Sequence, residues 1–522
     1  MNITPTDNSK ISLFVTVTLA YLIWIIAARS GTGDDTYWHI KVGEWIVTNK
    51  AVPQTGIFSY AAADFPWVSH EWLAAVLLYA VFSFSGWPGL IFLATFAIAL
   101  AMLMLFNFLV KRTSVNSSMI FLLLAYLLLI PHIMPRPHIF ALPIMVFWTI
   151  HLITAAESQK TPPLALALLM TLWVNMHGSF LIGLAFIVFF AAESIFLADN
   201  KGTKLKLAKN WLIFFTSSLF ATFLTPHGLD GLLLPLKLTG QTYMVDTIAE
   251  WASPNFHGFQ PLEIWLMLFI GVSLFKGLKL PIFRLVFILG LLHLSLKSIR
   301  HSTDLLSFLA PMVLAEPFAK QLKTPPNFNF SACYPKKIRH WLIFALYVAS
   351  IIAYLPNRLK VVDSDPGIQT GIESLQSIQT KKVLTALKSE REMLGNVLNS
   401  YALSVYMIHE DFPVFIDSRA ELYGDKFLKN YFDTINLSKG AEGVQKIIDK
   451  YNITWTIFET NLAINAFLEI SPNWRKIYTD RFLTIFLLGD KDISNNTKME
   501  LAKIKQSLPK QEIEEGYTER RF

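Results

Sequence analysis

Apolar segments long enough, or nearly long enough, to cross a lipid bilayer recur along the first two thirds of the chain, from Ile11 to about residue 355. The predicted crossings include residues 72–85, 89–110, 303–318 and 341–355. Hydrophobic residues make up 53% of the 522 residues, charged residues make up 16%, and phenylalanine alone occurs 41 times. Soluble domains do not have this balance, whereas polytopic helical membrane proteins do. The sequence therefore predicts a mainly α-helical, polytopic membrane domain with about 11–13 transmembrane helices.

The charges of the loops predict an orientation for these helices. The apolar segment 11–28 follows a nearly uncharged flank and is typical of an uncleaved signal anchor. Loops 201–210 and 320–340 carry lysine and arginine without acids, which places them in the cytoplasm. Loops 29–70 and 226–260 are acidic by comparison, which places them outside. The expected location is the bacterial cytoplasmic (inner) membrane.

The character of the chain changes after Pro356. Residues 1–356 are predicted to form the transmembrane domain, with 29–70 as its first outer loop. Residues 357–490 are polar enough to form a small extracytoplasmic α/β domain, and residues 491–522 are predicted to form a disordered tail. The α/β domain contains β-like runs separated by helical pieces, at 412–417, 453–459 and 482–488.

Two simple counts exclude other classes of protein. The single cysteine, Cys333, excludes a disulfide within the chain and a cysteine-based metal cluster. The net charge of +7 comes mostly from short loops and from the C-terminal third, so it does not indicate nucleic-acid binding.

Polar residues gather at the predicted outer ends of the apolar segments. Eight of the 12 histidines lie there, beside proline, glycine, arginine, asparagine or glutamate: His39, His70, His132, His138, His177, His227, His257 and His301. Ionisable groups at membrane depth usually line a cavity rather than face lipid. The pattern favours one polar cavity open to the outer face. The alternative, which the sequence leaves open, is that these residues cap helices or anchor them in the membrane interface.

The first outer loop is the most distinctive stretch, because an acidic pair, Asp34 and Asp35, precedes Tyr37, Trp38 and His39. Its residues "GDDTYWHIKVGEWI", "VPQTGIFSY" and "PWVSHEWLAAVLLY" resemble the first-loop signature of bacterial membrane proteins in the GT-C glycosyltransferase superfamily. The resemblance continues through "RPH", "LWVNMHGSFLIGL", "TPHG", "EWASPNF" and "RH". It reappears in the C-terminal part as "GNVLNSYALSVYMI" and "VFIDSRAELYG".

This resemblance implies a membrane glycosyltransferase with catalytic acids in the first outer loop and a variable outer domain. The donor would be a sugar linked to a polyprenyl phosphate, and the acceptor a glycan, lipid or protein that the sequence does not identify. One departure matters, because Asp34 and Asp35 are adjacent here, whereas many relatives have a spaced Asp-x-Asp pair. Two alternatives stay open: a non-catalytic relative that binds a lipid-linked glycan or scaffolds surface-polymer assembly, and a transporter or flippase.

The transfer reaction assigns roles to the polar residues. Asp35 is the first candidate for the base that takes the proton of the acceptor hydroxyl, and Asp34 is the second. Whichever aspartate is not the base can cap the following helix. Arginine matches phosphate in a fork geometry. The predicted phosphate-binding residues are therefore Arg136 and Arg300, with His39, His138 and His301. The remaining predicted cavity residues are His70, Glu71, Asn175, His177, Glu250 and Trp251.

Metal dependence stays open at this point. No histidine metal signature is present, but a hard divalent cation such as Mg²⁺ or Mn²⁺ can be held by Asp34, Asp35 and Glu250. In the outer domain, Asp417 and Arg419 suggest either a local salt bridge or turn cap, or a site for the acceptor.

Overall fold

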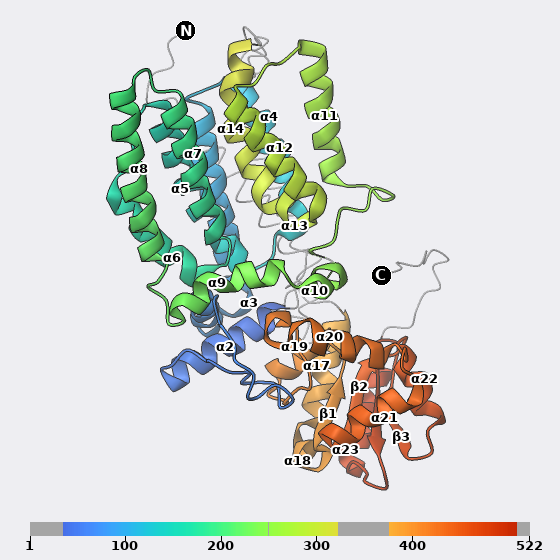
Figure 1. Ribbon diagram of the computed structural model, residues 1–522. Coiled ribbons are helices and arrows are strands. Elements are labelled where there is room, and N and C mark those ends of the chain that lie inside the picture. Colours follow the sequence, from blue (N-terminus) through green and yellow to red (C-terminus); the bar gives the residue numbers. More distant parts are fainter. Residues whose placement is uncertain (1–34, 249, 322–374, 509–522) are drawn as a thin grey trace. The chain divides into compact units, whose positions relative to one another are not determined.

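The computed structural model describes residues 35–248, 250–321 and 375–508, which form two compact units (Figure 1). The helical unit comprises Met1–Gly56, Asp64–Glu373 and Arg419–Leu428, and the α/β unit comprises Ile57–Ala63, Ser374–Ser418 and Lys429–Phe522. Each unit thus contains a short segment from the other's part of the sequence, which a single boundary near residue 356 does not predict. The predicted signal anchor 11–28, Asp34, most of the basic loop 320–340, the predicted crossing 341–355 and the predicted boundary lie outside the described residues.

The helical unit is a succession of helices. Its first part contains α2 (Asp35–Asn49), α3 (Trp72–Leu109), α4 (Val115–Leu129), η1 (Ile130–His132), α5 (Pro137–Glu157), η2 (Leu164–Leu168), α6 (Leu169–Met176) and α7 (Phe180–Phe196). Its second part contains α8 (Lys201–Ala221), α9 (Gly228–Thr239), α10 (Thr242–Thr247), α11 (Pro261–Lys276), α12 (Ile282–Lys297), α13 (Ile299–His301), η3 (Ser302–Leu306) and α14 (Ser307–Gln321). The helix α9 runs across the direction of α5, α7 and α8 (Figure 1).

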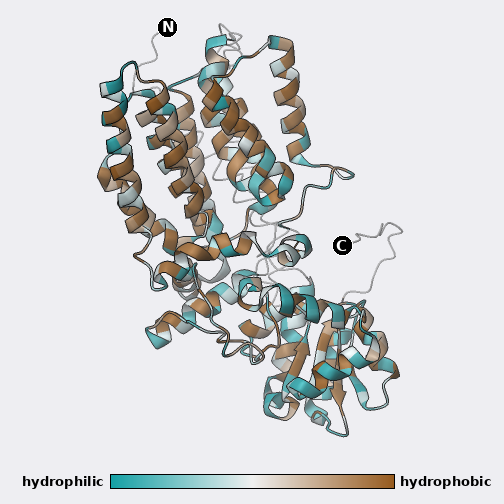
Figure 2. Ribbon diagram, viewed as in Figure 1, coloured by the Kyte–Doolittle hydropathy of each residue, from teal (hydrophilic) through white to brown (hydrophobic). Residues whose placement is uncertain are grey.

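Within the described residues, three helices are long and apolar enough to cross a membrane: Trp72–Leu109, Val115–His132 and Pro137–Glu157. Shorter apolar helices span Leu164–Met176 and Phe180–Phe196. Figure 2 shows hydrophobic residues along these helices and many more hydrophilic ones on the α/β unit. Large apolar side chains such as Phe92 (70% exposed) and Phe220 (74%) face outward, as lipid-facing residues do. The predicted fold class, membrane-spanning helices followed by a small α/β region, is confirmed.

Local sequence sets the ends and the breaks of these helices. The side chains of Ser114 and Asn200 cap α4 and α8 by accepting hydrogen bonds from backbone N–H groups three residues on. Helix α3 joins the predicted segments 72–85 and 89–110 across a kink at Gly86, where φ is 60° and Pro88 follows. A positive φ favours glycine, and proline lacks the N–H that a straight helix needs, so the kink is encoded in "SGWPG".

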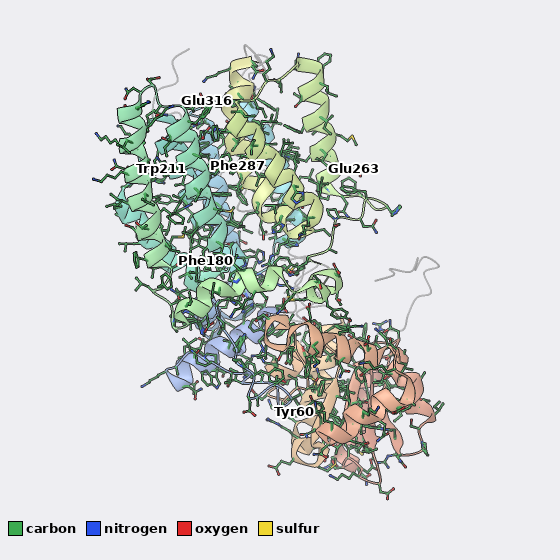
Figure 3. The ribbon with its side chains drawn as sticks, in the orientation of Figure 1. Tyr60, Phe180, Trp211, Glu263, Phe287 and Glu316 are labelled. Atoms are coloured by element: carbon green, nitrogen blue, oxygen red, sulfur yellow. The ribbon has the colours of Figure 1, made fainter. Side chains whose placement is uncertain are left out.

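Aromatic side chains fill the space between the helices. The Trp148 ring stacks on Phe214 with centroids 5.5 Å apart, and its indole N–H donates to the carbonyl of Gly183 (3.1 Å). A Cβ at Gly183 would lie 2.5 Å from the Trp173 ring, so a glycine is required for this close approach. Figure 3 labels Phe180, Trp211 and Phe287 among these buried side chains. This packing fixes the helix ends that carry the polar residues.

The α/β unit contains one four-stranded sheet with the order β1-β2-β4-β3. Its strands are β1 (Asn396–Asn399), β2 (Ile453–Glu459), β3 (Trp474–Thr479) and β4 (Leu483–Leu488). Strand β2 pairs in parallel with β1 and antiparallel with β4, which also pairs antiparallel with β3. The helices are α17 (Leu375–Leu387), η4 (Lys388–Glu390), α18 (Arg391–Leu394), α19 (Ser404–His409), α20 (Ala420–Ile435, with residues in both units), α21 (Gly440–Tyr451), α22 (Ala463–Ile470) and α23 (Asn495–Gln506).

Two details of this unit correct the sequence analysis. The run 412–417 is not a strand of the sheet: Val414 forms an isolated bridge with Ser59, and the hydroxyl of Tyr60 donates to the carbonyl of Val397 (2.7 Å; Figure 3 labels Tyr60). The predicted disordered tail is wrong over Asn495–Gln506, which is helix α23. The Ser494 side chain caps this helix, and Leu501 is buried in the unit.

Candidate functional site

The first part of the site is made where α2 and α5 begin. The Thr36 hydroxyl donates to the carbonyl of Pro135 (3.1 Å), which holds the two helix starts together. Asp35 is the first residue of α2, and Arg136 is the N-cap of α5. The Arg136 guanidinium consequently lies 3.2 Å from the carboxylate of Asp35, which also accepts a hydrogen bond from the Trp38 indole (3.2 Å).

Glu250 joins this pair from the segment before α11. Its carboxylate forms an ion pair with the same Arg136 nitrogen that faces Asp35. Burial alone would raise the pKa of Glu250, but the charges of Arg136 and Arg300 outweigh it and hold the pKa below its usual value. Two carboxylates therefore share one arginine.

Arg300 lies next to this group but is bound differently. Its backbone N–H donates to the carbonyl of Glu250 (3.3 Å), and its guanidinium lies over the Trp251 ring, 5.3 Å from the centroid. One guanidinium nitrogen lies 2.9 Å from Nε2 of His177. Because arginine is always protonated, this ring nitrogen accepts and His177 is neutral. Burial and the charge of Arg300 lower the pKa of His177 well below its usual value.

Glu71, the residue before α3, lies among three histidines. Its carboxyl oxygens lie 3.6 Å from His39, 3.7 Å from His70 and 3.5 Å from His177. Burial lowers the pKa of His39 to about 3 and raises the pKa of Glu71. Burial therefore favours neutral imidazoles at His39 and His177, beside a carboxyl that keeps its proton to a higher pH than a free glutamate.

Glu71 and two of these histidines line a small cavity within the helical unit. Its walls include His39, His70 and Glu71, with Trp38, Trp67 and Glu421. Trp67 donates its indole N–H to Glu421 (3.1 Å), and the fully buried Arg419 lies over its ring, 4.5 Å from the centroid. In the sequence, Arg419 lies within the predicted outer domain 357–490, more than 350 positions after Trp67. The structure places Arg419–Leu428 in the helical unit instead.

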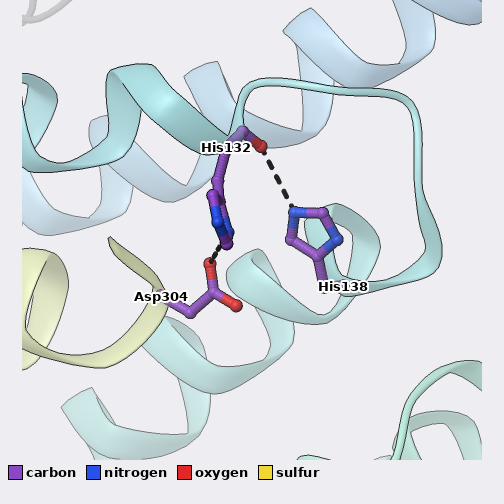
Figure 4. Close-up of side chains that lie close together, drawn as sticks. All are labelled: His132, His138 and Asp304. Carbon is purple, nitrogen blue, oxygen red and sulfur yellow. Dashed lines mark hydrogen bonds and ion pairs between the residues drawn. The ribbon is translucent and has the colours of Figure 1, made fainter. Parts of the chain in front are cut away.

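A second histidine group was not predicted as a site. His132, His138 and Asp304 are all buried, and each offers a ligand atom within 4.8 Å of the others (Figure 4). Nδ1 of His132 lies 3.9 Å from the carboxylate of Asp304, which lies 3.8 Å from Arg300. The sequence signal for Asp304 was an acid inside an apolar segment.

Three predicted site residues, Asn175, His301 and Trp251, contact residues next to these groups. The Asn175 side chain accepts from the Trp72 indole (2.6 Å) and donates to the carbonyls of Thr171 (2.7 Å) and Leu224 (2.9 Å), so it clamps the ends of three helices. Nδ1 of His301 lies 3.2 Å from the carbonyl of Leu294 in α12. Trp251 packs against both Arg300 and His301.

The predicted metal set of Asp34, Asp35 and Glu250 remains a prediction, because Asp34 lies outside the described residues. In the structure, the negative charge of Asp35 and Glu250 is already met by Arg136. The roles predicted for the other site residues also remain predictions, although the structure brings most of those residues into one contact network.

No protein-family model matches the chain, and no curated protein matches it. Among solved structures, the chain is similar to the crystal structure of ArnT from Cupriavidus metallidurans bound to undecaprenyl phosphate. The TM-score is 0.45 and the sequence identity is 11%, over 91% of this chain and 97% of that chain. A TM-score this low supports no argument about function, so the site is interpreted from its own residues.

Proposed function

We propose that the chain is a GT-C-like membrane glycosyltransferase that moves a sugar from a polyprenyl-phosphate donor to an acceptor at the outer face of the cytoplasmic membrane. The observation that carries the proposal is the contact network of Asp35, Arg136, Glu250, Arg300 and His177 at the ends of apolar helices. A carboxylate beside two half-buried guanidinium groups suits an acceptor hydroxyl next to a phosphate leaving group.

Arg300 is the better candidate of the two arginines for the donor phosphate. Arg136 is shared by two carboxylates, whereas the carboxylate nearest to Arg300, that of Asp304, lies 3.8 Å away. The neutral His177 bonded to Arg300 does not reduce its charge.

Asp35 is the proposed base. The acceptor hydroxyl gives its proton to the Asp35 carboxylate while its oxygen forms a bond to the anomeric carbon of the sugar. The bond from that carbon to the phosphate oxygen breaks, and the electron pair leaves with polyprenyl phosphate, which Arg300 stabilises. Arg136 and the Trp38 indole hold the Asp35 carboxylate in place. A direct displacement of this kind inverts the anomeric configuration.

The test compares wild type, Asp35→Asn and Asp64→Asn, each purified in detergent and checked for intact folding. Asp64 is a matched control, because it is an exposed aspartate of the same loop. Each protein is incubated with a lipid extract of the producing cell, and polyprenyl-phosphate-sugar species are followed by mass spectrometry. We expect wild type and Asp64→Asn to consume a donor and Asp35→Asn to lose about 10²–10⁴-fold in rate.

Binding of a lipid-linked sugar without consumption by any of the three proteins would contradict catalysis and support the non-catalytic binder. Equal consumption by Asp35→Asn would leave a transferase but remove Asp35 as its base. Movement of an intact lipid across proteoliposome membranes, without loss of its sugar, would support the transporter.

A further inference from the structure

The group formed by His132, His138 and Asp304 lies where three helices are interrupted. His132 ends the 3-10 turn η1 after α4, and His138 is the second residue of α5. Asp304 lies in η3, which is a π-helical turn between α13 and α14. Turns of this kind are rare and are found frequently at functional sites. The three side chains thus come from the end of one helix, the start of the next and a π-helical turn, and they converge (Figure 4).

Asp304 is a buried carboxylate that has no cation within hydrogen-bonding distance among the described residues. The hydrogen bond that it accepts within the described residues comes from the Thr303 hydroxyl at 3.3 Å. Its nearest cationic or imidazole nitrogens, in Arg300 and His132, lie at 3.8 and 3.9 Å, which is beyond hydrogen-bonding distance. Burying a charge is costly unless the charge is closely paired or binds a metal.

The available donor atoms suit a transition metal. Two imidazoles and one carboxylate form a set that Zn²⁺, Mn²⁺ and Fe²⁺ accept. The Thr303 hydroxyl lies 3.1 Å from Nδ1 of His132 and 3.3 Å from the carboxylate of Asp304, next to two of the three candidate ligands. Thr303 and Pro131, which adjoin Asp304 and His132 in the sequence, also line a small cavity.

We propose that His132, His138 and Asp304 bind one divalent transition-metal ion, with Zn²⁺ as the expected ion. The ligand atoms already lie within 4.8 Å of one another, so small side-chain movements suffice to close the site. His138 would leave its weak contact with the carbonyl of His132 (3.3 Å). Metal binding itself is independent of the proposed function. A contribution of the ion's charge, beside Arg300, to donor-phosphate binding does rest on that function.

The experiment uses the full chain in detergent, stripped with EDTA and then equilibrated with Zn²⁺ or Co²⁺. We expect one metal ion per chain by elemental analysis, and visible absorption bands of four-coordinate Co²⁺ that Zn²⁺ displaces. His132→Asn, His138→Asn and Asp304→Asn should each bind at least about 10-fold more weakly. His151→Asn is the matched control from the same helix as His138, and it should bind as wild type does.

Asp35→Asn separates this site from the acidic alternative. Retention of metal by Asp35→Asn, with loss in the three ligand variants, supports the proposal. Loss of metal in Asp35→Asn alone would place the ion at the acidic residues and overturn it. The absence of a bound ion in wild type, or binding that the ligand variants leave unchanged, would also overturn it and identify the group as a hydrogen-bonded cluster. If a variant fails to fold, the Co²⁺ spectrum of wild type still shows whether a four-coordinate metal site is present.

Failure of metal binding and failure of the proposed function have different readouts. A protein that consumes a lipid-linked sugar but binds no Zn²⁺ through these three residues is a transferase without this metal site. A protein that binds Zn²⁺ through these three residues but consumes no donor has the site without the proposed activity.

Discussion

The two ends of α5 carry two charged clusters that are built in different ways. At its start, Arg136 faces Asp35 and Glu250, and this group continues through Arg300 to His177. The helix ends roughly 30 Å further on at Glu157, which belongs to a second cluster. We call the first the Arg136 cluster and the second, which comprises Arg112, Glu157, Glu193 and Arg284, the Arg284 cluster.

The Arg284 cluster is made of close pairs in an apolar setting. Arg284 lies 2.9 Å from Glu193, and Arg112 lies 2.6 Å from Glu157. Both guanidinium groups also pack on phenylalanine rings, those of Phe190 and Phe108. Arg136 is also closely paired, with Asp35 (3.2 Å) and Glu250, but around it histidines contact carboxyl groups at 3.5–3.9 Å. Close pairs suit the stability of the fold, whereas loosely held groups can exchange their contacts for those of a ligand.

The largest expected effect is on stability, at the Arg284 cluster. Arg284→Met removes the close partner of Glu193, while Glu157 keeps Arg112, and removing one member of a buried ion pair costs about 3–5 kcal/mol. We expect a lower midpoint of thermal unfolding by tryptophan fluorescence, with unchanged turnover per folded molecule. The double variant Arg284→Met/Glu193→Gln should be less destabilised than the single one. If Arg284→Met unfolds like wild type but turns over slowly, the Arg284 cluster serves activity rather than stability.

The next effect is on activity, at the Arg136 cluster. Arg300→Gln removes the charge proposed to stabilise the leaving phosphate, which should lower turnover about 10²-fold. Because Arg300 is held by one neutral histidine and a distant carboxylate, the unfolding midpoint should change little. Arg112→Gln, the same substitution in the Arg284 cluster, should leave turnover unchanged. An equal loss in both variants would remove the functional distinction between the clusters.

A smaller effect concerns pH. Burial lowers the pKa of His39 from 6.5 to about 3, so the unfolded chain binds more protons than the folded chain between these values. The stability that His39 contributes is therefore complete above pH 6.5 and is lost as the pH falls, by about 2 kcal/mol at pH 5. His39→Gln should flatten the decrease in unfolding midpoint between pH 7 and pH 5. His151→Gln, in an exposed position, should not.

The smallest effect is expected at Glu71. Burial raises its pKa, so the folded state favours the protonated carboxyl, and stability is lost as the pH rises above the value for an unfolded glutamate. Glutamine mimics the protonated form, so Glu71→Gln should lose less stability than wild type as the pH rises. Parallel pH curves for the two proteins would show that Glu71 is ionised in the folded state.

Much of the Arg136 cluster can be predicted from the sequence, because its polar residues lie at the predicted ends of apolar segments. Asp35, Glu71, Arg136, His177 and Arg300 each lie at or beside a helix end, next to proline, glycine or aromatic residues, and the structure brings them together. Their roles in catalysis or phosphate binding remain predictions. His301 turns away because consecutive helical residues do not share a face, so it and Arg300 cannot both contact the group.

What the sequence analysis missed depends on contacts between distant segments. Asp304 lies in an apolar run that was interpreted as part of a crossing, and its partner His132 lies 172 positions earlier. Arg419 and Glu421 follow the run 412–417, and nothing in their spacing indicates Trp67. Helix α23 did have a local signal, the capping Ser494, but the charged composition around it favoured disorder.

The placement of residues 419–428 in the helical unit has a consequence for biosynthesis. Arg419 and Glu421 contact Trp67, and the Asp425 carboxylate accepts hydrogen bonds from the backbone N–H groups of Tyr243 (3.1 Å) and Met244 (3.0 Å) at the start of α10. The ribosome makes these residues after every described helix from α2 to α14. The membrane part of the protein is therefore finished late in translation, and a chain that stops before residue 428 lacks pieces of both units.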